Sequence, residues 1–116
     1  MQRRFRLTRS EDFKRVRRSG KSYAHPLVVL MVQKSEQPRL RVGIAAGKTI
    51  GTAVHRNRAK RLLREAMRSL LPSLASHLDL ILIARPSLAH ASLEETRQAL
   101  LTLFQRAQLL TPPHEP

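Results

Sequence analysis

The residues best suited to chemistry in this chain are the cations of the segment AVHRNRAKRLLREAMR, residues 53–68. Six of its sixteen residues are Lys or Arg, and Glu65 is its single acid. A guanidinium group pairs with phosphate oxygens through a fork of donors, and the free amides at the start of a helix add further donors. The segment therefore predicts a surface that binds a polyanion such as a phosphate backbone.

An apolar stripe in the same segment has the spacing of an α-helix. Apolar residues recur at i, i+3, i+4, i+7, i+8, i+11 and i+12, on Ala59, Leu62, Leu63, Ala66, Met67, Leu70 and Leu71. At about 100° per residue, the opposite face carries Asn57, Arg61, Arg64 and Arg68, with Arg58 and Lys60 on its flanks. Thr52 is placed to cap this helix and Pro72 to end it.

A basic helix face is also compatible with an ordinary solvated surface. Two features disfavour that alternative. Because Glu65 is the only acid, the face lacks the ion pairs at i,i+4 that stabilise exposed helices. Cations in the first turns also oppose the helix dipole, at roughly a few tenths of a kcal/mol each. We therefore interpret the face as a binding surface.

The net charge of +14 is confined to the first part of the chain. Residues 1–68 contain 19 Lys or Arg and four acids, whereas residues 69–116 contain three Lys or Arg and four acids. A basic surface kept only for solubility does not predict this asymmetry. We expect the first part to meet a polyanionic partner and the last part to build the fold.

Nothing in the sequence indicates catalysis by the protein itself. The eight acids are scattered, there is no cysteine, and the five histidines form no HExxH motif or close ligand pair. The glycines around residues 43–51 match neither a Walker A loop nor a dinucleotide fingerprint. We expect no catalytic residue, metal site or small-molecule cofactor, and, since no apolar run could span a membrane, a soluble cytoplasmic protein.

The elements that must position the basic face are predicted in one domain, residues 1–110, followed by a flexible tail, residues 111–116. A first helix over residues 7–20 has capping-box spacing at Thr8 and Glu11 and an exit glycine, Gly20. Two strands, 23–34 and 39–47, are predicted to pair as an antiparallel hairpin. After the basic helix come a buried strand, 78–84, and a last helix.

The last helix opens with capping-box spacing at Ser92 and Glu95. Its inward residues are predicted to be Leu93, Leu100, Leu103, Phe104 and Ala107. The order helix, strand, strand, helix, strand, helix predicts an α+β fold, a small two-layer sandwich.

The segment GKTIGTAVHRNRAKRLLREAMR, residues 47–68, resembles the signature of the protein subunit of bacterial ribonuclease P. The likeness continues in RLTRSEDFKRV, DLILIAR and EETRQALLTLFQRA and so covers nearly the whole chain in order. The resemblance implies the order α-β-β-α-β-α with a left-handed crossover through the basic helix. The usual right-handed rule for parallel crossovers argues against that handedness.

The resemblance also implies that catalysis belongs to a partner, the ribonuclease P RNA. This RNA removes the 5′ leader of precursor tRNA with magnesium ions, and the protein alone binds no cofactor. The residues that would contact it are Lys48, Arg56, Asn57, Arg58, Lys60, Arg61, Arg64 and Arg68. Arg56 projects near the edge of the apolar stripe, so it either binds at the helix entrance or runs past the core as a structural residue.

A second surface implied by the resemblance is a cleft between the first helix and the sheet, which receives the single-stranded leader. The candidate residues are Phe13, Arg17, Val28, Leu30 and Met31. Since the whole chain has three Phe and one Tyr, we expect the cleft to rely on charge and aliphatic contact more than on base stacking. For Phe13 the alternative is plain core packing.

Two other classes of protein share this composition. A ribosome-associated or general structured-RNA-binding protein would differ in the order of motifs and in the RNA that it captures. A DNA-binding protein would lay the basic helix in a major groove and prefer duplex DNA, but the strand-flanked helix lacks a helix-turn-helix partner.

Overall fold

A computed structural model describes residues 5–110 of the chain. Its helices and strands, in chain order, are α1 (Ser10–Ser19), β1 (Lys21–Ala24), β2 (Val28–Lys34), β3 (Arg41–Ala45), α2 (Ala53–Leu70), β4 (Leu78–Ala84) and α3 (Leu93–Arg106). Short 3₁₀ turns follow some of them, at η2 (Lys48–Ile50), η3 (Leu71–Ser73) and η4 (Pro86–His90). The predicted tail, 111–116, lies outside the described residues.

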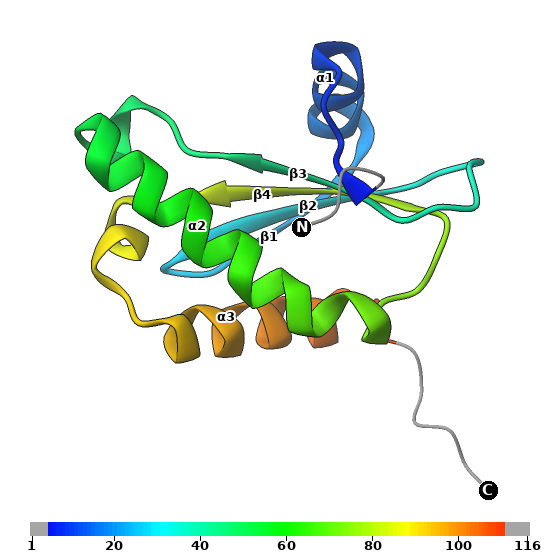
Figure 1. The fold of residues 1–116 in the computed structure, drawn as a ribbon. Coiled ribbons are helices and arrows are strands. Elements are labelled where there is room, and N and C mark those ends of the chain that lie inside the picture. Colours follow the sequence, from blue (N-terminus) through cyan, green and yellow to red (C-terminus); the bar gives the residue numbers. More distant parts are fainter. Residues whose placement is uncertain (1–4, 111–116) are drawn as a thin grey trace, which may run out of the picture.

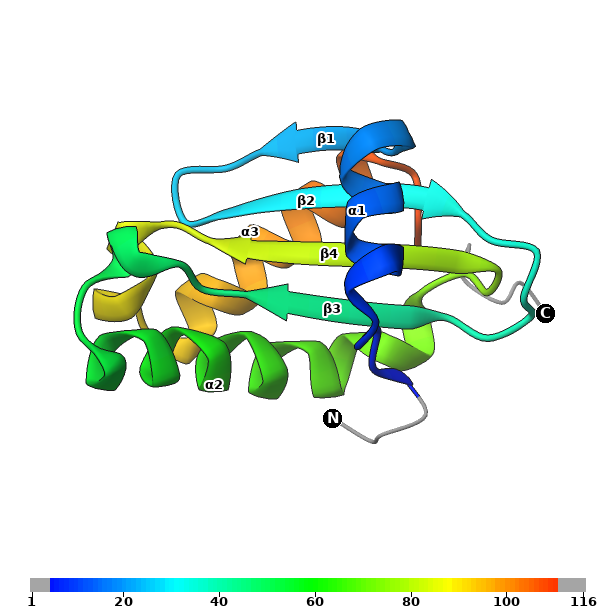
Figure 2. The ribbon, with the colours of Figure 1, turned by 90° about the horizontal axis from the view of Figure 1, so that it is seen from above.

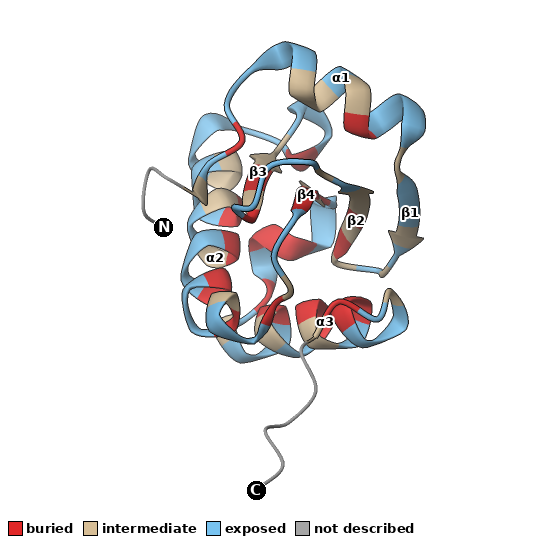
Figure 3. Ribbon diagram, turned by 90° about the vertical axis from the view of Figure 1, so that its right-hand side faces the viewer, coloured by how far each residue is buried: buried red, intermediate tan, exposed pale blue. Residues whose placement is uncertain are grey.

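The sheet separates α1 on one face from α2 and α3 on the other (Figure 1). Figure 3 shows the buried residues of α2 and α3 on the sides of these helices that face the sheet. The predicted α+β fold is confirmed, and α1 adds a cover over part of the outer face of the sheet. None of the helices between residues 5 and 110 combines the length and apolarity needed to cross a bilayer.

The strand order is β1-β2-β4-β3, so the predicted hairpin of strands 23–34 and 39–47 is wrong. The first of these runs is itself a hairpin, because Pro26 interrupts it and the amide of His25 donates to the carbonyl of Val28 at 3.0 Å. β2 then pairs antiparallel with β4, and β3 pairs in parallel with β4, with a further isolated bridge from Val42 of β3 to Arg6. β4, a nearly continuous apolar run, lies between β2 and β3, and nearly all of its residues are buried there.

The connection from β3 through α2 to β4 is a left-handed crossover. Figure 2 views the sheet from the α1 face, with β3 and β4 running in the same direction and α2 returning beneath them. Since β4 lies on the inner side of β3 and α2 lies on the far face, the hand is the rare one for parallel strands. The handedness implied by the resemblance is confirmed.

The main core lies between the sheet and the two long helices. It contains the fully buried side chains Leu30, Leu63, Met67, Leu80, Leu82, Leu100, Leu103 and Phe104. Of the other predicted inward residues of α3, Leu93 and Ala107 are half-buried. A smaller cluster under α1 joins Leu7, Val16 and Ile81, with Phe13, Met31 and Ile83 at its margin.

Two of the three predicted helix starts are confirmed. The Thr52 hydroxyl accepts from the amide of His55, and Ser92 and Glu95 form a complete capping box. The hydrogen bond from the Ser92 amide lowers the pKa of the Glu95 carboxyl. The capping box predicted at Thr8 is wrong, because α1 begins at Ser10 and its N-cap, Arg9, makes no side-chain cap bond.

Candidate nucleic-acid interface

The outer face of α2 exposes the cations that the helical spacing placed there. Asn57, Arg61, Arg64 and Arg68 are exposed, and Lys48 is exposed on the 3₁₀ turn before the helix. On the opposite side Ala59, Leu63, Ala66, Met67 and Leu70 are buried. The apolar stripe thus fixes the rotation of α2. As a consequence, the surface formed by Lys48, Asn57, Arg61, Arg64 and Arg68, which we call the basic row, faces solvent.

The cations of this row differ in how far they are free to bind. Within residues 5–110, no side chain pairs with Arg61 or Arg64. Arg68 has an exposed ion pair with Glu65 at 3.4 Å, and such pairs contribute about 0–1 kcal/mol. Arg61 and Arg64 are therefore the cations most available to an external anion.

Arg58 is partly committed to the fold, which the sequence did not indicate. Its Nε donates to the carbonyl of Ala89 at 2.7 Å, and its Nη2 donates to the carbonyl of Ala91 at 3.3 Å. These bonds tie the first turns of α2 to η4 and to the residue that follows it. Arg58 can donate hydrogen bonds to an external ligand only through the donors that remain.

Arg56 and Lys60 lie at the margins of the basic face. Both are half-buried. The Nε of Arg56 is buried and has no hydrogen-bond partner among the described residues. This placement agrees with the structural alternative for Arg56, a stem that runs past the core toward solvent.

A buried carboxylate, Asp79 in β4, holds α1 to the sheet. Arg41 donates to it from Nε at 3.0 Å and from Nη2 at 2.9 Å, and Arg15 of α1 donates at 2.6 Å. Arg15 also donates to Gln33, and both arginines reach Asp12, at 3.1 and 3.5 Å. We call these five residues the Asp79 network.

The Asp79 side chain is fully buried, so its charge requires these partners. The hydrogen bond to Asp79 raises the pKa of the Arg15 guanidinium above its ordinary value. Sequence reasoning missed the network. The one available signal was an acid in the second position of an otherwise apolar strand, LDLILIA.

The Asp79 network lies on one flank of α1, and Phe13 and Arg17 lie on the other. At about 100° per residue, Phe13 and Arg17 project within about 40° of each other, whereas Arg15 projects roughly to the opposite side of the helix. Phe13 is half-buried, and its ring lies against the backbone of Gly43, in the place that a Cβ on Gly43 would occupy. Arg17 is exposed.

Two of the residues predicted for the leader cleft do not lie on this side of the sheet. Val28 and Leu30 are fully buried in the main core, so the expectation that they line the cleft is wrong. Side chains of a strand alternate between faces, and Met31 is the predicted residue that faces α1. Val29 of β2 and Ile83 of β4 share this face and are half-buried. We call Phe13, Arg17, Val29, Met31 and Ile83 the α1-side surface.

Comparison with protein families identifies relatives along almost the entire chain. The family model described as Ribonuclease P matches residues 1–108. The chain is 44% identical to the ribonuclease P protein component of Herpetosiphon aurantiacus, in a match that covers 94% of this chain and 89% of the relative. It is 38% identical to that of Bacillus cereus, with 92% and 94% covered.

Solved structures show the same fold. The ribonuclease P protein of Staphylococcus aureus superposes with a TM-score of 0.83 at 27% identity, over 92% of this chain and 98% of the other. That of Thermotoga maritima superposes with a TM-score of 0.78 at 28% identity, over 87% and 96%. The arrangement of α1, the sheet and α2 is therefore common to these proteins.

The Asp79 network generates a prediction about stability. Asp79→Ala leaves two guanidinium groups without their buried partner and is expected to lower the free energy of unfolding by about 3 kcal/mol. Asp12→Ala, the matched control, removes a partly exposed carboxylate from the same network and is expected to cost about 1 kcal/mol. Urea unfolding measures both. Equal losses would show that burial of Asp79 does not govern the network.

Proposed function

Because the chain belongs to the ribonuclease P protein family, we propose that it is the RNA-binding subunit of a ribonuclease P and removes the 5′ leader of precursor tRNA together with a catalytic RNA. The observation that carries the proposal is the pair of exposed arginines on α2, Arg61 and Arg64, which have no acidic partner within residues 5–110. A phosphate backbone supplies that partner.

In this proposal α2 binds the catalytic RNA as a rigid rod. Its eighteen residues extend over about 27 Å, and burial of its apolar stripe fixes its rotation about the helix axis. Cations three or four residues apart lie about 5–6 Å from one another along one side, so they are presented in a fixed row. The contacts are assigned to Lys48, Asn57, Lys60, Arg61, Arg64 and Arg68, with partial contributions from Arg56 and Arg58.

The α1-side surface is the proposed contact for the leader. It joins an aromatic ring, three aliphatic side chains and one exposed guanidinium. Aliphatic and aromatic side chains can pack against the faces of unstacked bases, and Arg17 supplies a positive charge for the phosphate backbone of the leader. In this role Val29 and Ile83 replace Val28 and Leu30, whose side chains lie in the core.

We place the chemistry of cleavage on the RNA partner. Among residues 5–110, no three His, Cys, Asp or Glu side chains gather as a metal site. The magnesium ions that the resemblance implies are therefore assigned to the RNA in this proposal. The protein's part is to hold the substrate and the catalytic RNA together.

Reconstitution tests the proposal directly. The protein is added to the ribonuclease P RNA of the same organism at low magnesium, and cleavage of a precursor tRNA is compared with that by each component alone. We expect cleavage at the mature 5′ end only in the mixture. If the RNA gains nothing from the protein, the alternative of a general structured-RNA-binding protein is favoured.

The role of α2 predicts a change in the salt dependence of RNA binding. Arg61→Ala combined with Arg64→Ala is expected to reduce the slope of log affinity against log salt by about one unit for each phosphate that the variant no longer neutralises. Arg97→Ala combined with Arg106→Ala removes the same charge from α3 and serves as the control. The slope is measured by filter binding to the ribonuclease P RNA. An unchanged slope in the first variant would remove this face from the interface.

The α1-side surface predicts a selective effect on precursor tRNA. Phe13→Leu keeps an apolar side chain against Gly43 but removes the ring, and is expected to weaken binding of the holoenzyme to precursor tRNA by about fivefold. Binding to mature tRNA is expected to change little, since it has no leader. Phe104→Leu, in the main core, is the control for a ring removed away from this surface. Equal weakening for the two tRNAs would reduce Phe13 to a packing residue.

A further inference from the structure

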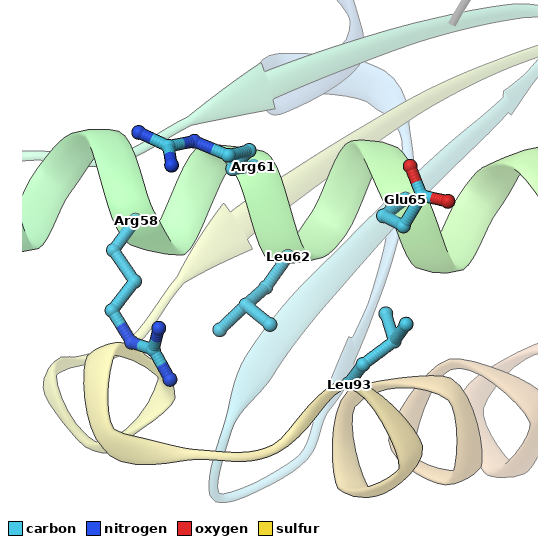
Figure 4. A pocket seen from close by; sticks show the side chains of 5 residues that line it. All are labelled: Arg58, Arg61, Leu62, Glu65 and Leu93. Carbon is cyan, nitrogen blue, oxygen red and sulfur yellow. The ribbon is translucent and has the colours of Figure 1, made fainter.

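A pocket opens between α2 and the start of α3 (Figure 4). It is lined by Arg58, Arg61, Leu62, Glu65 and Leu93 and has a volume of about 220 Å³. An apolar cavity of roughly 150 Å³ is enough to bind benzene. The pocket is therefore large enough for a flat aromatic group. Apart from Arg61, its lining residues belong neither to the basic row nor to the α1-side surface.

The floor of the pocket is apolar and incompletely covered. Leu62 belongs to the apolar stripe of α2, yet it is half-buried where its neighbours Ala59 and Leu63 are fully buried. Leu93, the first residue of α3, is also half-buried. Figure 4 shows both side chains projecting into the space between the two helices. Covering them with an apolar surface would be favourable, at about 25 cal/mol for each Å² removed from water.

A fixed guanidinium stands at one end of this floor. Arg58 is held by its bonds to the carbonyls of Ala89 and Ala91, and Figure 4 shows its head group beyond Leu62. Because these bonds fix the side chain in advance, little further entropy is lost when a ligand packs against it. A guanidinium plane is a stacking surface for an RNA base.

The rim of the pocket is charged. Arg61 and Glu65 project from α2 above the floor, toward the basic face (Figure 4). Arg61 is exposed and has no acidic partner among the described residues. A phosphate bound to Arg61 would bring the attached nucleoside to the edge of the pocket. Glu65 can accept a hydrogen bond from an exocyclic amino group.

We propose that this pocket receives one unstacked nucleobase of the RNA that binds along α2. The base lies on Leu62 and Leu93 with its plane against the guanidinium of Arg58, and its phosphate is bound by Arg61. The inference rests on the proposed function, because RNA bound to α2 supplies the base. Charge favours this occupant over an apolar side chain of another protein, since two arginines border the pocket.

A mononucleotide titration tests the pocket itself. The full chain is labelled with ¹³C in its leucine methyl groups and titrated with adenosine 5′-monophosphate, and separately with ribose 5-phosphate as the probe without a base. We expect the ring current of adenine to shift the methyl signals of Leu62 and Leu93, with a dissociation constant on the order of millimolar. The methyl signals of Leu101, a half-buried residue of α3 that does not line the pocket, are expected to stay in place.

Three outcomes would overturn the proposal. Equal shifts with the two probes would mean that phosphate alone is bound. Unchanged signals of Leu62 and Leu93 would mean that no base enters. Shifts of these signals that depend on protein concentration without nucleotide would assign the pocket to a second copy of the chain.

Binding of the ribonuclease P RNA separates this inference from the proposed function. Leu93→Ala is expected to weaken RNA binding about fivefold while leaving the salt slope unchanged, because it removes an apolar surface for the base and no charge. Leu101→Ala is the matched control and is expected to leave RNA affinity unchanged. Suppose that Leu93→Ala has no effect on RNA affinity although Arg61→Ala with Arg64→Ala reduces the salt slope. That result would overturn the inference about the pocket and leave the proposed function of α2 in place. If the slope does not change in that double variant, the proposed function of α2 is overturned as well.

Discussion

The position of α1 depends on one buried charge, the carboxylate of Asp79. A fully buried carboxylate without partners would cost several kcal/mol, so the fold must bring cations to it. Arg41 comes from the neighbouring strand β3 and Arg15 from α1, and together they satisfy both carboxylate oxygens. Because Arg15 reaches Asp79 from α1 above the sheet, the ion pair helps to hold α1 where it crosses the strands.

This anchoring leaves the second flank of α1 free. The Asp79 network occupies the flank that carries Asp12 and Arg15, so Phe13 and Arg17 lie on the other flank, where Phe13 packs against the sheet and Arg17 is exposed. Gly43 contributes by having no side chain, since the ring of Phe13 occupies the place where a Cβ would lie. The α1-side surface is thus a product of the same contacts that hold α1 in place.

The left-handed crossover determines how the two proposed RNA surfaces are arranged. It places α2 on the face of the sheet that α3 also covers, opposite α1 (Figure 2). A right-handed crossover between the same two strands would have put α2 on the face of α1, where it would compete for the α1-side surface. With the observed hand, the basic row and the α1-side surface lie apart, so that in the proposed function they bind two segments of RNA together.

The sequence by itself determined the local elements of this protein and the solvent face of its basic helix. The spacing from Ala59 to Leu71 predicted which side of α2 is buried, and the caps at Thr52 and Ser92 predicted where helices begin, because these signals act between residues a few positions apart. The resemblance supplied the crossover, which no local pattern encodes.

Only the tertiary structure decided that β4 lies between β2 and β3, which removed the predicted hairpin. It also decided that Val28 and Leu30 point into the core, because an apolar run buried on both faces does not reveal which face α1 covers. The bonds of Arg15 to Asp79 and of Arg58 to Ala89 join residues far apart in the chain, and such pairings depend on how the whole fold packs rather than on any spacing in the sequence.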